Sequence, residues 1–136
     1  MKSSKKKIIG WTLSALIAAF LTFASASGKF TEWEGKEELF AEMGWSTEIM
    51  FKIGFVEVLV ALLFLVPKIA IYGAILLTAY LGGATATHIR MGEAFYMPIV
   101  IGILVWIALA FRDPSVFKAL LSKRPESSTT SLSNET

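Results

Sequence analysis

Four apolar stretches constrain the fold of this 136-residue chain more than any other feature. They cover residues 8–26, 49–66, 69–89 and 96–111. As α-helices they would be roughly 24 to 32 Å long, close to the thickness of the hydrocarbon core of a membrane. With 54% hydrophobic and 18% charged residues, the chain has too little polar surface to cover a water-soluble globule. We therefore predict an all-α integral membrane protein, an antiparallel four-helix bundle in contact with the lipid bilayer.

The basic residues are divided unevenly between the two sides of this predicted bundle. One side holds nine of them, namely Lys2, Lys5, Lys6, Lys7, Lys68, Arg112, Lys118, Lys123 and Arg124. The other side holds Lys29, Lys36, Lys52 and Arg90. Because basic residues are retained in the cytoplasm, we expect both termini there, in a multi-pass protein of the bacterial cytoplasmic membrane. The net charge of +2 comes from this asymmetry and does not indicate a nucleic-acid partner.

The first apolar stretch has a second interpretation, a cleavable export signal. The lysines at 5–7, the apolar run and Ala24-Ser25-Ala26 match the three parts of such a signal. However, the run from Ile8 to Phe23 is longer than the usual signal core. Small residues also recur along one face, as helix packing in membranes requires; they are Gly10, Ser14, Ala18 and Ser25. We expect the stretch to be retained as a span.

Between the first two stretches, residues 29–46 alternate acidic and aromatic side chains. Leu39, Phe40 and Met43 would share one side of a short helix, and Gly44 is suited to end it. We predict an interfacial helix on the outer membrane surface. A ligand lid is the alternative function for this segment.

Proline marks the remaining boundaries of the predicted domain. Pro67-Lys68 leaves only a few residues to reverse direction, so the second and third spans form an antiparallel hairpin. Asp113-Pro114 is typical of a helix start and predicts a short helix over 115–121. We therefore expect one transmembrane domain over 1–121. The Ser/Thr-rich segment 122–136 is predicted to be a disordered cytoplasmic tail.

Glu57 is the least expected residue inside any of the four stretches. A carboxylate near the centre of a membrane helix costs about 2.5–3.5 kcal/mol, so it should face the bundle interior and be paired or protonated. The candidate charge partners are Lys52 on the same helix and Arg90 near the end of the next. Either a proton-handling or ligand-binding site, or a structural hydrogen bond between two helices, would explain it.

The third stretch supplies the other polar candidates. Tyr80, Thr87 and His88 fall on one helical face, so with Glu57 they form a candidate polar site inside the membrane. A lone imidazole near a membrane surface can also be a merely interfacial residue. Glycines at helix interfaces allow close approach, and we expect packing contacts at Gly54, Gly73, Gly82 and Gly83.

Several classes of chemistry have no residues to support them. The chain has no cysteine, which excludes a dithiol centre, thiolate catalysis and the usual iron–sulfur ligands. A single histidine excludes bis-histidine haem. No phosphate loop, nucleophile elbow or metal-ligand spacing is present. We expect no metal and no intrinsic cofactor, so any electron transfer would use a borrowed cofactor or a diffusing quinone.

The hairpin carries a resemblance to a known family. The segments are Gly54-Phe-Val-Glu57, Pro67-Lys68, the run from Gly73 through Gly82-Gly83 to His88-Ile-Arg90, then Trp106 and Arg112-Asp113-Pro114. Together they resemble the DoxX-like family of small bacterial membrane proteins, over residues 8 to about 121. The resemblance implies four membrane helices. Founding relatives are described as the small membrane subunit of a thiosulfate:quinone oxidoreductase, but fold analogy does not transfer function, and thiosulfate is not indicated here.

These observations lead to one expected function and two rivals. The expected function is an accessory or anchoring subunit, not catalytic alone, beside a membrane oxidoreductase with quinone-linked chemistry. The first rival is a small-solute or proton transporter, which would require a homo-oligomer because four helices form a thin wall. The second is a non-catalytic scaffold that binds a partner through its outer loop or its tail.

Overall fold

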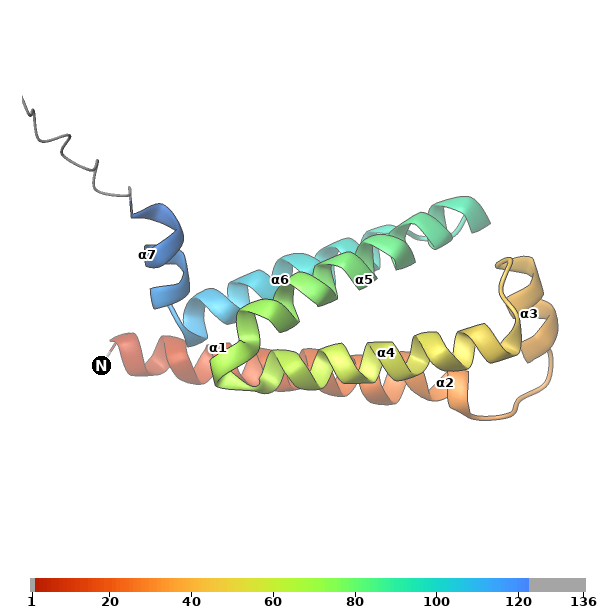
Figure 1. Cartoon of the computed structure of the whole chain (residues 1–136), viewed down its shortest axis with the longest axis horizontal. Coiled ribbons are helices and arrows are strands. Elements are labelled where there is room, and N and C mark those ends of the chain that lie inside the picture. The colour runs from red at the N-terminus through yellow and green to blue at the C-terminus, as the bar shows by residue number, and fades with distance from the viewer. Residues whose placement is uncertain (1, 123–136) are drawn as a thin grey trace, which may run out of the picture.

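The computed structural model of the chain describes residues 2–122, and within that range every regular element is a helix (Figure 1). The all-α prediction is therefore confirmed. The elements in chain order are α1 (Lys2–Ala19), the π-helical η1 (Phe20–Ala26), α2 (Ser27–Phe30), α3 (Lys36–Glu42), α4 (Thr47–Leu65), the 3-10 turn η2 (Pro67–Ile69), α5 (Ala70–Met91), α6 (Tyr96–Arg112) and α7 (Ser115–Leu121). The predicted tail, apart from Ser122, lies outside the described residues.

Within residues 2–122, two helical stretches are long and apolar enough to cross a membrane, Lys2–Phe30 and Pro67–Met91. The first joins α1, η1 and α2 in one continuous helix. α6 is also apolar but has only 17 residues. α4 has 19 residues and carries three charged side chains, Glu48, Lys52 and Glu57. Length and composition thus support a membrane protein, although α4 carries more charged side chains than α5 or α6.

The four long helical segments pack side by side along their lengths, and each contacts two of the others. α1 lies against α6 and α4, and α5 lies against α4 and α6 (Figure 1). The core between them is formed by large apolar side chains with almost no exposure, namely Leu21, Phe64, Leu77, Val105 and Leu109. Many other apolar side chains face outward, such as Phe23, Phe55 and Ile103. Because such a surface suits hydrocarbon better than water, the packing agrees with a membrane environment.

One end of the molecule is closed by contacts between backbones; we call it the closed end, and it includes the N-terminus, η2 and α7. A Cβ on Gly73 would lie 2.4 Å from the backbone nitrogen of Phe64. A Cβ on Gly10 would lie 2.6 Å from that of Arg112. Only glycine permits these approaches. The packing expected at Gly73 is thus present, and Gly10 makes an equivalent contact between α1 and α6.

Arg112 seals the closed end. Its side chain is buried, its Nη2 donates a 2.6 Å hydrogen bond to the carbonyl oxygen of Phe64, and its guanidinium lies 4.5 Å from the ring centre of Trp11. The next residue, Asp113, accepts a 3.1 Å hydrogen bond at Oδ1 from the backbone nitrogen of Ser115. This contact begins α7 where the Asp-Pro pair predicted a helix.

The opposite end, which includes α2, α3 and the α5–α6 turn, is more open, and we call it the open end. There α5 and α6 diverge from α1 and α4 (Figure 1). A Cβ on Gly82 or Gly83 would meet nothing within 4 Å, so the packing contacts expected at these two glycines are wrong. No described residue of a neighbouring helix packs against either of them. α5 and α6 remain joined by the indole N–H of Trp106, which donates a 2.9 Å hydrogen bond to Thr78 Oγ1.

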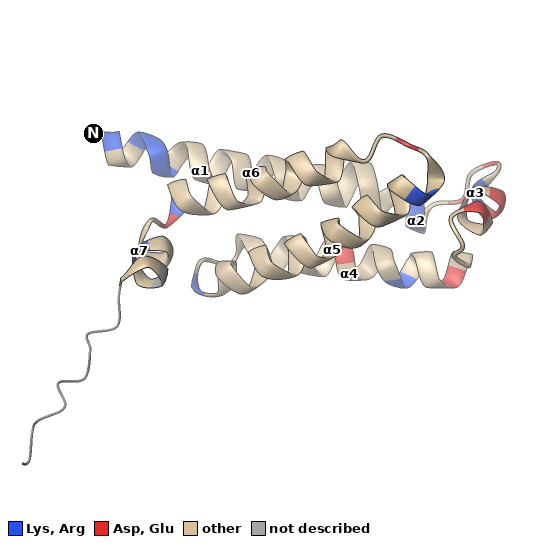
Figure 2. Ribbon diagram, turned by 90° about the horizontal axis from the view of Figure 1, so that it is seen from above, with Lys and Arg blue, Asp and Glu red and all other residues tan. Residues whose placement is uncertain are grey.

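The charged residues divide between these two ends. Basic residues gather near the N-terminus and at the η2 turn, whereas acidic residues gather around α3 (Figure 2). α3 buries Phe40 and ends before Gly44, whose φ of 80° only glycine adopts readily. The two ends therefore differ in charge as well as in packing.

Candidate ligand-binding cavity

A buried ion pair lies at the centre of the candidate site. Lys29 Nζ of α2 is 2.8 Å from Glu57 Oε2 of α4. The Glu57 side chain has no exposure and the Lys29 side chain is 12% exposed. The pair therefore joins the first and second long helices inside the protein, and it gives Glu57 the partner that a buried carboxylate was expected to need.

The π-helical segment places Lys29 opposite Glu57. A π-helix has more residues per turn than an α-helix, so it changes which face the following residues present, and such segments are frequent at functional sites. The Lys29 ammonium also donates hydrogen bonds to the carbonyl oxygen and hydroxyl of Ser25, at 3.1 and 3.4 Å. Its aliphatic stem passes over Gly54, where an added Cβ would lie 3.0 Å from Lys29 Cβ. Gly54 is thus a packing residue, as predicted, and it makes room for the lysine.

The predicted charge partners of Glu57 are wrong. Lys52 pairs with Glu48 at 2.7 Å, one turn away on the exposed face of α4. Five residues separate Lys52 from Glu57, which turns the two side chains about 140° apart around the helix. Arg90 instead donates a hydrogen bond to the carbonyl oxygen of Met43. Lys29 was missed because the first helix continues beyond residue 26, the end of the predicted span.

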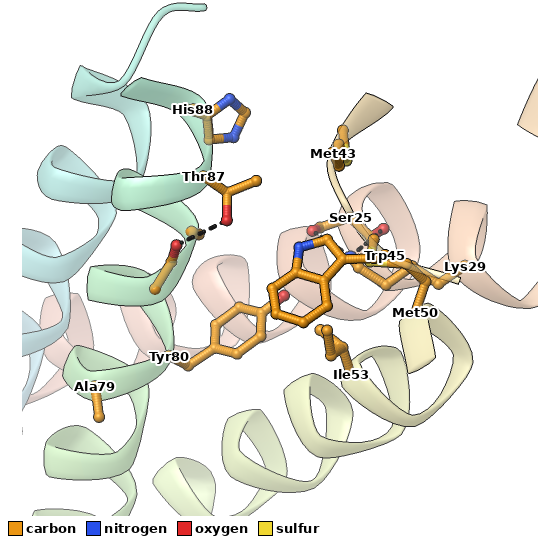
Figure 3. Close-up of a pocket in the computed structure, with 12 residues that line it drawn as sticks. Ser25, Lys29, Met43, Trp45, Met50, Ile53, Ala79, Tyr80, Thr87 and His88 are labelled. Atoms are coloured by element: carbon orange, nitrogen blue, oxygen red, sulfur yellow. Dashed lines mark hydrogen bonds between the residues drawn. The ribbon is translucent and has the colours of Figure 1, made fainter. Parts of the chain in front are cut away.

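A cavity of about 350 Å³ lies beside the ion pair at the open end (Figure 3). It is lined by residues of η1, α2, α4, α5 and the segment after α3, namely Ser25, Lys29, Met43, Trp45, Met50, Ile53, Ala79, Tyr80, Gly83, Ala84, Thr87 and His88. Three of the four predicted site residues are among them: Tyr80, Thr87 and His88. Glu57 lies behind the wall, linked to the cavity through Lys29. Trp45 was not anticipated as a lining residue, although its segment was considered as a lid.

The polar groups around the cavity differ in what they can still bind. Thr87 Oγ1 donates to the carbonyl oxygen of Gly83 at 3.1 Å. His88 Nδ1 lies 2.8 Å from Glu93 Oε2. The phenol of Tyr80 lies close to the Glu57 carboxylate. Among the described residues, Glu57 Oε1 is buried without a hydrogen-bond partner.

The lining combines an apolar body with a few polar groups on one side. Figure 3 shows the rings of Trp45 and Tyr80 facing the cavity, with Ser25 and Lys29 behind them. Cavities of this size and character suit small organic molecules that carry oxygen acceptors on an apolar ring. No group of three His, Asp or Glu side chains that could hold a metal is found among residues 2–122.

A search of curated proteins and a search of solved structures gave no significant match. The comparison with protein families gave a match. The family model described as the DoxX-like family matches residues 12–110, a range that includes both members of the ion pair and all residues that line the cavity. The chain belongs to the DoxX-like family.

Proposed function

We propose that the protein is a multi-pass, antiparallel four-helix bundle of the bacterial cytoplasmic membrane, with both termini in the cytoplasm. Four lengthwise helical segments and an outward apolar surface support this arrangement. The closed end carries the basic N-terminal segment and Lys68, and basic residues favour the cytoplasmic side. The buried residues of the first helix, such as Ile17 and Leu21, support its retention as part of the bundle.

In this orientation the cavity opens toward the outer leaflet, and we propose that it binds the ring of a lipid-soluble quinone. The observation that carries the proposal is the buried pair of Lys29 and Glu57 at the wall of an aromatic-lined cavity. Hydrogen-bond donors on one side would face a quinone carbonyl, while Met50 and Ile53 would contact the apolar ring. The protein would act as an accessory or anchoring subunit of a membrane oxidoreductase and would not be catalytic alone.

The cost of the ion pair supports a functional role. Two charges lose their hydration when they are buried, and replacing such a pair by apolar residues of similar volume is often neutral or stabilising. Intramembrane ionisable residues are therefore expensive to keep and usually mark ligand or proton pathways. A bundle that required only stability would be served as well by two leucines at positions 29 and 57.

Binding can be measured in lipid nanodiscs with 1,4-naphthoquinone as the probe. Replacing Trp11, Trp33 and Trp106 by Phe leaves Trp45, in the cavity wall, as the only tryptophan. We expect saturable quenching of its fluorescence, above that of a control in which Trp45 is replaced and Trp33 retained. Quenching that is equal in both proteins and rises linearly with quinone in the lipid would refute a specific site.

The role of the ion pair can be tested with Glu57→Gln, which removes the charge with little change in volume. We expect weaker naphthoquinone binding by about tenfold, whereas Glu48→Gln, in the exposed pair on the same helix, should bind as the wild type does. Unchanged binding by Glu57→Gln would show that the ion pair takes no part in quinone binding. Purification from native membranes, followed by mass spectrometry, tests for a co-eluting oxidoreductase.

A transporter is less well supported by this arrangement. All residues that line the cavity lie toward the open end, whereas Gly10 and Gly73 hold backbones together at the other end. A path across the membrane would require these contacts to separate. Proton flux in vesicles that depends on Glu57 would favour transport over the accessory role.

A further inference from the structure

We propose that the cavity takes the oxyanion of a lipid-soluble organic acid together with one proton, with the Lys29 ammonium turning from Glu57 to the ligand. This inference rests on the proposed function of the cavity as a ligand site and specifies the charge of the ligand it takes. It follows from how Lys29 is held. Its three donors are directed to Glu57 Oε2 and to the two oxygens of Ser25, and its side chain also lines the cavity.

The charge balance of the site requires the proton. In the empty site, one ammonium and one carboxylate cancel. An anion that entered alone would leave a net charge of −1 in a region of low polarity, which is strongly unfavourable. If Glu57 takes one proton from the solvent as the anion arrives, the net charge is zero before and after binding. Lys29 stays protonated and exchanges one hydrogen-bond acceptor for another.

The surroundings of Glu57 allow its carboxylate to take this proton. Oε1 is buried and receives no hydrogen bond from the described residues, so it is free to be protonated. The Tyr80 phenol lies close to the carboxylate and can exchange hydrogen bonds with either of its forms. Tyr80 also lines the cavity and so connects Glu57 to the ligand space.

The other ionisable groups nearby are separately engaged. Among the described residues, the ionisable groups of neighbouring helices that interact with Glu57 are Lys29 of α2 and Tyr80 of α5. Lys52 of α4 is paired on the exposed side with Glu48, and His88, at the outer part of the cavity, is paired with Glu93. α1 and α6 carry their charges at the closed end. Glu57 is therefore the group expected to take the proton.

The test compares two probes that share a ring and differ in charge. 2-Hydroxy-1,4-naphthoquinone is an anion near neutral pH, whereas 1,4-naphthoquinone is neutral. With the protein in nanodiscs and empty nanodiscs as the blank, we expect the affinity for the anion to rise about tenfold for each unit decrease in pH, the slope for one linked proton. The affinity for the neutral probe should stay constant. A pH indicator in weakly buffered solution should record about one proton taken up per anion bound.

Variants test whether Glu57 is the group that takes up the proton when the anion binds. In Glu57→Gln the pH slope should vanish, and affinity for the anion at the highest pH should exceed that of the wild type by at least tenfold. His88→Gln should keep the wild-type slope. In the double variant Lys29→Met/Glu57→Gln, the ratio of the affinity for the anion to the affinity for the neutral probe should fall at least tenfold below that of Glu57→Gln. If Glu57→Gln does not fold, the visible absorption spectrum of 2-hydroxy-1,4-naphthoquinone bound to the wild-type protein decides, because it shows whether the ligand is bound as the anion, with the proton on the protein, or as the neutral acid.

The outcomes separate this inference from the proposed function. A flat pH profile, no proton uptake, or a slope lost in His88→Gln would overturn the proton-linked anion site. Specific binding of 1,4-naphthoquinone with no linkage for the anion would leave the quinone cavity standing and refute only the inference. Failure of both probes to bind would refute both.

Discussion

Glycine has opposite structural roles at the two ends of the molecule. At the closed end, Gly10 and Gly73 lie against the backbones of neighbouring helices, where an added Cβ would approach to 2.6 and 2.4 Å. At the open end, Gly82 and Gly83 have no neighbour within 4 Å. The sequence alone does not distinguish a glycine that allows close contact from a glycine that leaves space. The first pair joins the helices, whereas in the second pair Gly83 lines the cavity and Gly82 lines an open groove between α5 and α6.

The polar groups follow the same division. At the closed end, Arg112 is enclosed by Trp11 and Phe64 and does not line the cavity of the candidate site. At the open end, the pair of Lys29 and Glu57 is also largely buried, but it has one member in a cavity wall. We infer that the closed end serves helix packing alone, whereas the open end combines a buried ion pair with a binding cavity. The following predictions test that difference.

Loss of one member of the ion pair should have the largest effect on stability. Lys29→Met leaves a buried carboxylate without its cation, and we expect the free energy of unfolding to fall by about 3–5 kcal/mol. Adding Glu57→Leu should restore most of that loss, because the isolated charge is removed as well. Reversible unfolding in mixed micelles measures both. A double variant as unstable as the single one would show that the pair is required for the fold itself.

The glycine contrast predicts the next largest effect. Gly73→Ala places a methyl group against the backbone of Phe64, which cannot move aside as a side chain can, and we expect a loss of at least about 1–3 kcal/mol. The matched control is Gly82→Ala on the same helix. It fills open space and should be neutral, or more stable by up to about 1 kcal/mol through helix propensity. Equal losses in both variants would contradict the division into two ends.

Much of this organisation was predictable from sequence because it depends on local patterns. The four apolar stretches became the four long helical segments, and Asp113-Pro114 placed the start of α7 correctly. The partner of Glu57 was not predictable in this way. Lys29 lies beyond the apolar run, and only the continuous helix through η1 and α2 brings it to α4. The glycines of α5 were likewise ambiguous, because composition does not reveal which part of a helix diverges from its neighbours.

The bond between α5 and α6 should contribute less. Trp106→Phe keeps the ring but removes the N–H that donates to Thr78 Oγ1, and hydrogen bonds between membrane helices average about 0.6 kcal/mol. Thermal unfolding should therefore show a small decrease in stability, with quinone binding unchanged. A loss of binding would indicate that the divergence of α5 and α6 depends on this contact.

The exposed ion pair should have the smallest effect. Lys52 and Glu48 are 68% and 78% exposed, and pairs of this kind contribute little because water screens both charges. Glu48→Gln should leave both unfolding and quinone binding unchanged within error. A change as large as that of Lys29→Met would contradict the distinction between the exposed and buried pairs.

Cross-linking with a photoreactive azidoquinone, followed by peptide mass spectrometry, tests most directly whether the open end is the binding region. The cavity account predicts labels at Trp45, Ile53 and Tyr80, and their loss when excess 1,4-naphthoquinone competes. The comparison site is the apolar groove between α5 and α6 that contains Ile99 and Ile103. Labelling concentrated in that groove, or spread over the lipid-facing surface and insensitive to competition, would contradict the account.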